Sequence, residues 1–483
     1  MSISAALNAA QSGLQVSGLR AEVVAKNVAN ASTPGYVRRS LVISELMVGS
    51  QTAGVTSNGV ARVQDSAIKS QRRELTSDVA QATVLASTWQ SIATRVGSTA
   101  DGTGLFSAFS KFETALSTSI TSPESTATTA ALLDAAKGIA RELNSLSAYA
   151  AQARSEADSE IAQGVETVNA SLKQIQDLNK RLSGMDRTSE QAAMLLDERQ
   201  RVLDTIAEYL PVQTVQRDGG TIDVLTTQGV YLINGSSVQE IEFTPSNSFT
   251  SDRTLAGGQL SGISVSGTDL TPGSTSFGAV SGGLFGALFT LRDADLPAFM
   301  DQLDMVANDV ITRLSDDSID PTKTPGEQGL FVDPAGGSTL GLASRISINA
   351  AIDPAQGGEI WRLRDGIGAA TSGPPGDSTI LSAMFDAFTQ VKSMTGAGLQ
   401  GSFSATDLTA QLSSLVGQKR VYQDSVLAST QAQHLTLVEA EQSLTGVDVD
   451  QQMEELLLIE QAYSANARVI QSARDMINIL MEL

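Results

Sequence analysis

Residues 448–483 read DVDQQMEELLLIEQAYSANARVIQSARDMINILMEL, and one set of positions in this stretch recurs at alternating three- and four-residue steps. Such spacing places side chains along one face of a helix and is the register of a coiled coil. The positions are Leu456, Ile459, Tyr463, Asn466, Ile470, Ala473, Ile477 and Leu480. The stretch therefore predicts a long helix that packs against a partner helix.

Residues 1–31 repeat this rhythm at the other end of the chain. The spaced positions are Ile3, Leu7, Ala10, Leu14, Ser17, Ala21, Val24 and Val28. Neither predicted helix can bury its stripe alone, because an apolar stripe needs a second element to cover it. We therefore expect the two ends to meet, either each other or the equivalent ends of neighbouring molecules.

Two motifs accompany these helices. The first is NVANASTPGYVR at residues 27–38, and the second combines GVDVD at residues 446–450 with EQAYSANARVI at residues 460–470. Both resemble signatures of the bacterial flagellar axial-protein family, which includes rod, hook and hook-associated proteins. The Thr-Pro-Gly-Tyr turn and the long middle section are most similar to the hook-associated members.

The resemblance implies a structural, non-enzymatic protein that forms the junction between hook and filament and is needed for filament assembly. As partners it implies copies of the same chain in a ring, the hook protein, the second hook-filament junction protein and a type III export chaperone. It also implies export through the flagellar type III apparatus by an uncleaved N-terminal signal, and hence a secreted, extracellular location in the flagellum.

The resemblance places the assembly interface on the terminal helices and on the turn after the first of them. The N-terminal residues are Leu7, Leu14, Val24, Asn27, Val28, Asn30, Pro34, Gly35 and Tyr36. The C-terminal residues, shared between assembly and the chaperone, are Leu456, Ile459, Ala462, Tyr463, Asn466, Ile470, Ile477 and Leu480. We expect the chaperone to cover Ala462, Tyr463, Ile470 and Ile477. A polar residue at a seam position, as at Asn466, costs stability but specifies register and partner number.

Composition argues against several other classes of function. The net charge of −21 disfavours nucleic acid and anionic lipid as main partners, because both need clustered positive charge. There is no cysteine. The single histidine, His434, has no second histidine at the spacing of a zinc motif, and we do not expect it to act as the base of a Ser-His-Asp triad. We expect no cofactor, no metal and no small-molecule substrate. No apolar run is long enough to span a bilayer, and residues 1–31 lack the apolar core of a cleavable signal peptide, so we expect no membrane insertion.

Periodicity predicts a mainly α fold with a β insertion. Its parts are terminal helices that form a coiled coil, a long helical bundle in the middle, and a small β domain inserted within the bundle. The expected divisions are 1–70, N-terminal helix and an irregular segment; 71–210, first part of the bundle; 211–285, β-rich inserted domain; 286–315, returning helix; 316–376, loop and β segment; 377–444, last part of the bundle; and 445–483, C-terminal helix.

Within the bundle, the longest pattern runs over residues 131–183, with a stutter of consecutive four-residue steps from Ala153 to Val165. The period changes from 3.6 to 2 at Pro211, and Asp218-Gly219 and Asn234-Gly235 predict two hairpin turns. Helices are also expected at 189–209, 378–394 and 404–444, and Pro297 is expected to kink or restart the returning helix.

The two ends carry opposite charge. Residues 1–73 contain eight Arg or Lys and three acids, whereas residues 448–483 contain seven acids and two Arg. We expect these regions to attract each other within or between subunits, which sets orientation more than affinity.

Three alternatives remain beside the junction protein. One is another axial protein of the hook or distal rod, which would be β-rich between its terminal helices. Another is an enzyme domain hosted by residues 212–376, and the third is a secreted coiled-coil effector.

Overall fold

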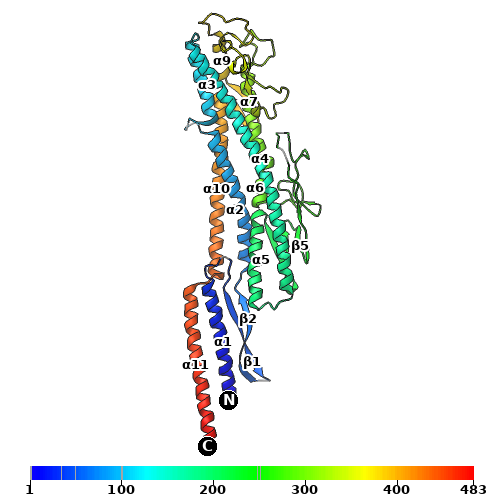
Figure 1. Ribbon diagram of the computed structural model, residues 1–483, viewed down its shortest axis with the longest axis vertical. Coiled ribbons are helices and arrows are strands. Elements are labelled where there is room, and N and C mark those ends of the chain that lie inside the picture. Colours follow the sequence, from blue (N-terminus) through cyan, green and yellow to red (C-terminus); the bar gives the residue numbers. More distant parts are fainter. Residues whose placement is uncertain are drawn as a thin grey trace.

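A computed structural model describes residues 3–33, 35–48, 51–98, 100, 102–246, 249–250 and 252–482. The chain is elongated, with its two terminal helices side by side at one end and a long helical bundle above them (Figure 1). The main helices are α1 (Ile3–Ala29), α2 (Ser66–Val96), α3 (Gly104–Thr121), α4 (Thr126–Ser183), α5 (Glu190–Tyr209), α6 (Gly283–Thr290), α7 (Leu296–Leu314), α8 (Arg362–Asp365), α9 (Thr379–Thr389), α10 (Ala405–Thr445) and α11 (Val449–Glu482). The predicted class, mainly α with small β regions, is confirmed.

Short antiparallel sheets accompany the helices. Their strands are β1 (Arg39–Val48), β2 (Gln51–Arg62), β3 (Val212–Gln216), β4 (Ile222–Thr226), β5 (Tyr231–Asn234), β6 (Ser237–Val238), β7 (Ile241–Glu242), β8 (Ser264–Val265), β9 (Thr268–Asp269), β10 (Phe331–Val332), β11 (Ser347–Ile348), β12 (Lys392–Gly396) and β13 (Leu399–Phe403). The order β3-β4-β5-β6 forms one sheet of the insertion, and β7-β8-β9 forms another.

Helix α4 is a single helix of 58 residues, capped by the Ser125 hydroxyl, which accepts a hydrogen bond from Thr128 N. Its apolar stripe serves two separate cores. Leu132 to Ala150 belong to the upper core, and Ala157 to Leu178 belong to the lower core. The predicted long pattern of residues 131–183 is therefore one continuous helix, and it joins two packed units.

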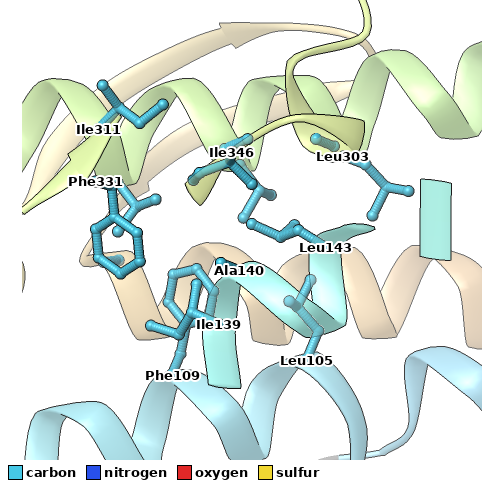
Figure 2. Packing of buried hydrophobic residues seen from close by; sticks show 14 of the residues in the cluster. Leu105, Phe109, Ile139, Ala140, Leu143, Leu303, Ile311, Phe331 and Ile346 are labelled. Atoms are coloured by element: carbon cyan, nitrogen blue, oxygen red, sulfur yellow. The ribbon is translucent and has the colours of Figure 1, made fainter. Parts of the chain in front are cut away.

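The upper core contains aromatic and aliphatic side chains from helices far apart in sequence. Figure 2 shows Phe109 of α3, Leu143 of α4 and Phe331 of β10 directed toward one another. The ring of Phe112 lies 5.0 Å from that of Phe388, centroid to centroid, and neither side chain is exposed. Apolar burial of this kind is the main stabilising term of the bundle.

The lower core buries α4 and α5 against the inserted sheets. Both predicted hairpin turns are present, and Gly219 and Gly235 have φ values of 77° and 61°, which favour glycine. Ile263 and Val265 contribute fully buried side chains from the Gly- and Ser-rich part of the insertion. That part is consequently packed rather than loosely attached.

Buried charges lie at the boundary between the cores, within the predicted stutter of α4. Arg292 Nη1 donates to Asp158 Oδ1 at 2.6 Å, and Arg154 Nε donates to the Arg292 carbonyl at 2.9 Å. All three side chains are at most 2 % exposed. Each cation is thus satisfied by carboxylate or carbonyl oxygens, as burial requires.

The structure corrects several sequence-based expectations. The segment expected to be irregular, in the part of residues 1–70 after the first helix, contains a long antiparallel strand pair, β1–β2, whose register is interrupted by two bulges. The helix expected at 378–394 ends at Thr389, and residues 392–403 form the hairpin β12–β13 instead. Helix α3 was not predicted, although Leu105, Phe109, Phe112 and Leu116 follow a helical period.

Pro297 stands near the start of α7, after a single π-helical turn at Leu291–Asp295. Because proline has no N–H to donate to the preceding turn, the hydrogen-bond ladder widens just before it. His434 lies half-buried on α10, with Nε2 at 3.2 Å from Thr76 Oγ1 of α2. Burial lowers the pKa of its imidazole. No helix of the described residues is long and apolar enough to cross a bilayer.

Candidate assembly interface

Helices α1 and α11 run antiparallel, so the two ends of the chain meet each other (Figure 1). Their seam keeps a seven-residue period on both sides. On α11 it contains Gln452, Ile459, Asn466 and Ala473, and on α1 it contains Ala10, Ser17 and Val24. The α1 residues are mostly small, which lets the two backbones approach closely.

Gly13 is the point of closest approach in this seam. A Cβ at this position would lie 2.7 Å from Asn466 Nδ2, inside contact distance. Gly18, five residues later on the same helix, has no atom near an added Cβ. Glycine at 13 therefore makes room for the amide of Asn466, whereas Gly18 faces open space.

A second face of α1 packs against the β1–β2 hairpin. Ser12 Oγ accepts a hydrogen bond of 3.1 Å from Val55 N, and the backbone of Gly54 comes close enough that a Cβ there would overlap the same hydroxyl. Val16 and Val23, which share this side of the helix with Ser12, are buried. The terminal unit is thus three-layered: α11, α1 and the hairpin.

Asn27 joins these layers. Its Nδ2 donates to the Arg39 carbonyl at 2.9 Å and to Gln452 Oε1 at 2.7 Å. Its Oδ1 accepts from Arg39 N at 3.0 Å and from the Tyr36 hydroxyl at 2.9 Å. Burial raises the pKa of the Tyr36 phenol, so this hydroxyl remains a donor at neutral pH. The amide, 1 % exposed, has its full complement of four hydrogen bonds.

Ion pairs attach the terminal unit to the bundle. Asp197 of α5, itself buried, accepts from Arg39 Nη2 at 3.1 Å and from Arg62 Nε at 2.9 Å. The guanidinium of Arg39 also lies 4.9 Å from the centre of the Tyr36 ring. At the C-terminal side, Arg38 N donates to the Thr445 carbonyl at 2.8 Å.

The predicted interface residues fall into three groups. Val24, Asn27 and Ile459 are buried within the chain. Those that are partly buried are Leu7, Leu14, Val28, Asn30, Tyr36, Leu456, Asn466 and Ile470. Those that are exposed are Gly35, Ala462, Tyr463, Ile477 and Leu480. Pro34 lies outside the described residues. One predicted seam therefore divides between a face used inside the chain and a face open to solvent.

The open face of α11 is larger than the heptad indicated. It also carries exposed large apolar side chains at Met453, Leu457, Leu458, Val469, Met476, Ile479 and Met481. Monomeric proteins rarely expose apolar patches of this extent without a partner. These residues lie off the seam that the heptad pattern predicts. Gly13, Gln452 and Asp197 are also absent from the predicted interface, because their roles depend on contacts distant in sequence.

The expected attraction between oppositely charged ends has a small structural counterpart. Arg20 Nη2 lies 2.9 Å from Glu455 Oε1, and both side chains are more than a third exposed. Exposed pairs of this kind contribute little to stability. Among the described residues the terminal helices share no other ion pair, so packing and the Asn27 hydrogen bonds dominate their contact.

Three family models match successive parts of the chain. Residues 89–320 match the helical domain of the flagellar hook-associated protein FlgK, residues 7–36 match the flagella basal body rod protein, and residues 442–483 match the C-terminal region of the flagellar basal body rod FlgEFG proteins. The two end matches coincide with α1 and α11. The central match runs from the last part of α2 through α7.

Similar whole proteins are flagellar hook-associated protein 1 of three bacteria. The Salmonella typhimurium protein is 26% identical over 53% of this chain and 47% of its own length. The Escherichia coli protein is 24% identical over 63% of this chain and 55% of its own, and the Bacillus subtilis protein is 21% identical over 96% and 95%. The chain thus spans about half the length of the Salmonella relative that it matches.

A solved structure of the flagellar hook junction protein FlgK from Burkholderia pseudomallei is 20% identical, with a TM-score of 0.43, over 55% of this chain and 46% of that one.

Gly13→Leu should force α1 and α11 apart, because the new side chain would overlap Asn466. We expect a loss of about 1–3 kcal/mol in the stability of the helix pair, the usual cost of overpacking. Hydrogen exchange of the α11 amides measures it. Gly18→Leu is the matched control and should leave exchange unchanged or slower, since leucine favours helix more than glycine does. Equal effects of both substitutions would contradict the close packing at Gly13.

Asn27→Ala should leave the Arg39 N–H and carbonyl without their partner inside a buried site. We expect unfolding of the terminal unit to become easier by roughly 3 kcal/mol, because buried polar groups that lose partners cost about 1–3 kcal/mol each. Urea unfolding followed by hydrogen exchange at residues 39–62 is the measurement. Asn30→Ala is the control, since the Asn30 side chain bonds only within its own helix end and turn. A similar loss in both variants would show that Asn27 has no special role.

Proposed function

We propose, from the premise that the chain is related to flagellar hook-associated protein 1, that it is a structural subunit of the bacterial flagellum placed between hook and filament. The observation that carries this proposal is the order of the matches. Rod-type segments coincide with the paired terminal helices, and the hook-associated helical domain coincides with the bundle between them. Another axial protein, of hook or distal rod, is disfavoured because its middle would be β-rich.

The open face of α11 supports assembly with other axial proteins. Tyr463, Leu457 and Leu480 are each more than half exposed. In a tube of subunits, copies of this chain in a ring would cover that face, with the hook protein on one side and the second junction protein on the other. The free energy of burying these side chains, about 25 cal/mol per Å², would then drive assembly.

The proposed interface comprises the predicted N-terminal and C-terminal residues in distinct roles. Val24, Asn27 and Ile459 hold α1 and α11 together, and the exposed residues make contacts between subunits. We also propose where each part of the chain lies in the tube. The terminal helices would form the tube wall, the bundle would stand outside it, and the insertion at 211–285 would lie farthest out.

Export follows from the same proposal. A chain that leaves the cell unfolded through the type III apparatus must keep its apolar α11 stripe covered beforehand, and an export chaperone on Ala462, Tyr463, Ile470 and Ile477 would cover it. The mature protein would then lie outside the cell in the flagellum. In this proposal its role is mechanical and non-enzymatic.

The decisive experiment is deletion of the gene, with electron microscopy of the cells and a flagellin assay of the medium. Bare hooks and unpolymerised flagellin outside the cell are the expected result. Absence of hooks would point to a rod or hook component instead, and normal filaments would overturn the flagellar reading.

Complementation with Tyr463→Glu tests the open α11 face. A carboxylate in an apolar contact between subunits is costly to bury, so filament number should fall at least tenfold while the protein stays folded. Tyr231→Glu is the matched control, because Tyr231 is exposed on β5 of the insertion and should tolerate the change. Filaments are counted by microscopy, and helicity of the purified variants is checked by circular dichroism. Full filamentation with Tyr463→Glu would remove this face from the interface.

A further inference from the structure

A cationic cavity of about 750 Å³ lies where β2, the start of α2, α5 and the β3–β4 hairpin meet. Six basic side chains line it, and none of its lining residues is acidic. The six are Arg62, Lys69, Arg73, Arg187, Arg199 and Arg217. This is unexpected in a chain of net charge −21, in which acids outnumber bases 53 to 32.

Only half of these cations have a carboxylate partner. Arg62 pairs with Asp197, Arg73 with Asp204, and Arg217 with Asp223. Two of those carboxylates are shared further, since Asp197 also pairs with Arg39 and Asp204 with Arg72.

The other three cations have no ion-pair partner among the described residues. They are Lys69, Arg187 and Arg199. Arg199 Nη1 donates instead to neutral oxygens, Asn179 Oδ1 at 2.9 Å and the Gly220 carbonyl at 2.8 Å. Arg39 and Arg72 bring the number of cations around the cavity to eight. Because Arg72 also pairs with Glu441, these eight cations face four carboxylates, Asp197, Asp204, Asp223 and Glu441. The surplus is four positive charges.

Lys69 is the least satisfied of them. Its side chain is 6 % exposed, and its ammonium makes no hydrogen bond or ion pair with any described residue. Burial, and secondarily the charge of Arg62, lowers the pKa of this ammonium, and the smaller opposing effect of the Glu441, Asp197 and Asp204 carboxylates does not cancel that shift. Burial likewise lowers the pKa of the Arg199 guanidinium to about 10. A buried charge without a partner is costly, and a folded chain normally retains one only where something else compensates it.

We propose that this cavity is a binding site for a multivalent oxyanion, held by Lys69 and flanked by Arg62, Arg73 and Arg199. Guanidinium groups bind carboxylate and phosphate oxygens through paired N–H donors, and the ammonium adds a point charge. Because the site is concave, it suits a compact anion better than it suits the flat surface of a partner helix. The oxyanion can be a phosphate-type ion or a cluster of carboxylates, and the site would exist in the isolated chain whether or not the chain assembles.

The test measures thermal unfolding of the full-length monomer in pyrophosphate, in citrate, and in sodium chloride of equal ionic strength. The two oxyanions should raise the unfolding midpoint beyond chloride, because a ligand of the folded state stabilises it. Lys69→Gln should weaken the apparent affinity about tenfold, the loss of one charge-assisted contact. Without added anion, Lys69→Gln should unfold at the same or a higher temperature, since it removes an unpaired buried charge.

Arg141→Gln is the matched control, because Arg141 is an exposed cation on α4 outside the cavity, paired only with Asp134. It should keep the full oxyanion response. A response to both probes identifies a site for oxyanions in general, and a response to pyrophosphate alone identifies a phosphate-type site. No oxyanion effect beyond chloride, or equal effects in the Lys69 and Arg141 variants, would overturn the proposal. Arg199→Gln supplies a second cavity variant.

Discussion

The hydrogen bonds of Asn27 are the constraint on which the terminal unit depends. One buried amide satisfies the backbone of the hairpin at Arg39, the hydroxyl of Tyr36 and the side chain of Gln452 on the last helix. A side chain with fewer donors or acceptors would leave a buried polar group without a partner. A single residue therefore positions the first helix, the turn, the hairpin and the last helix relative to one another. The ion pair between Arg39 and Asp197 connects this group to α5.

Small residues on both sides of α1 allow its two neighbours to pack closely against it. Gly13, Ser17 and Ala10 let α11 lie close to α1, and Gly54 lets the hairpin lie close to the opposite face. Because α1 is covered on two sides, all of its stripe is at least partly buried inside the chain, and Ala10, Ser17 and Val24 are buried. Helix α11 is covered on one side only, and its remaining apolar face stays open. This asymmetry is why the proposed contacts between subunits lie mainly on the last helix.

Periodicity predicted the long helices and the two insertion hairpins, because those features depend on local spacing and turn chemistry. It also predicted that the terminal helices are covered by a partner helix, but not whether that partner lies in the same chain. The β1–β2 hairpin was missed because its strands are interrupted by bulges and by Gly54 and Gly59, which weaken the alternating pattern. The roles of Gly13, Gln452 and Asp197 depend on partners hundreds of residues away and leave no local trace. The cationic cavity likewise combines residues of three separate segments, and only their contact in the fold brings the cations together.

The unbroken course of α4 has a mechanical consequence. Because one helix of 58 residues contributes side chains to both cores, a pull applied to either core travels along its continuous ladder of backbone hydrogen bonds, with no slack loop to absorb it. Midway along it, the ion pair of Asp158 with Arg292 and the hydrogen bond from Arg154 to the Arg292 carbonyl resist sliding of one core past the other, since any shift would leave a buried charge without its partner. The bundle should therefore respond to tension as one stiff rod rather than as two units joined by a flexible linker.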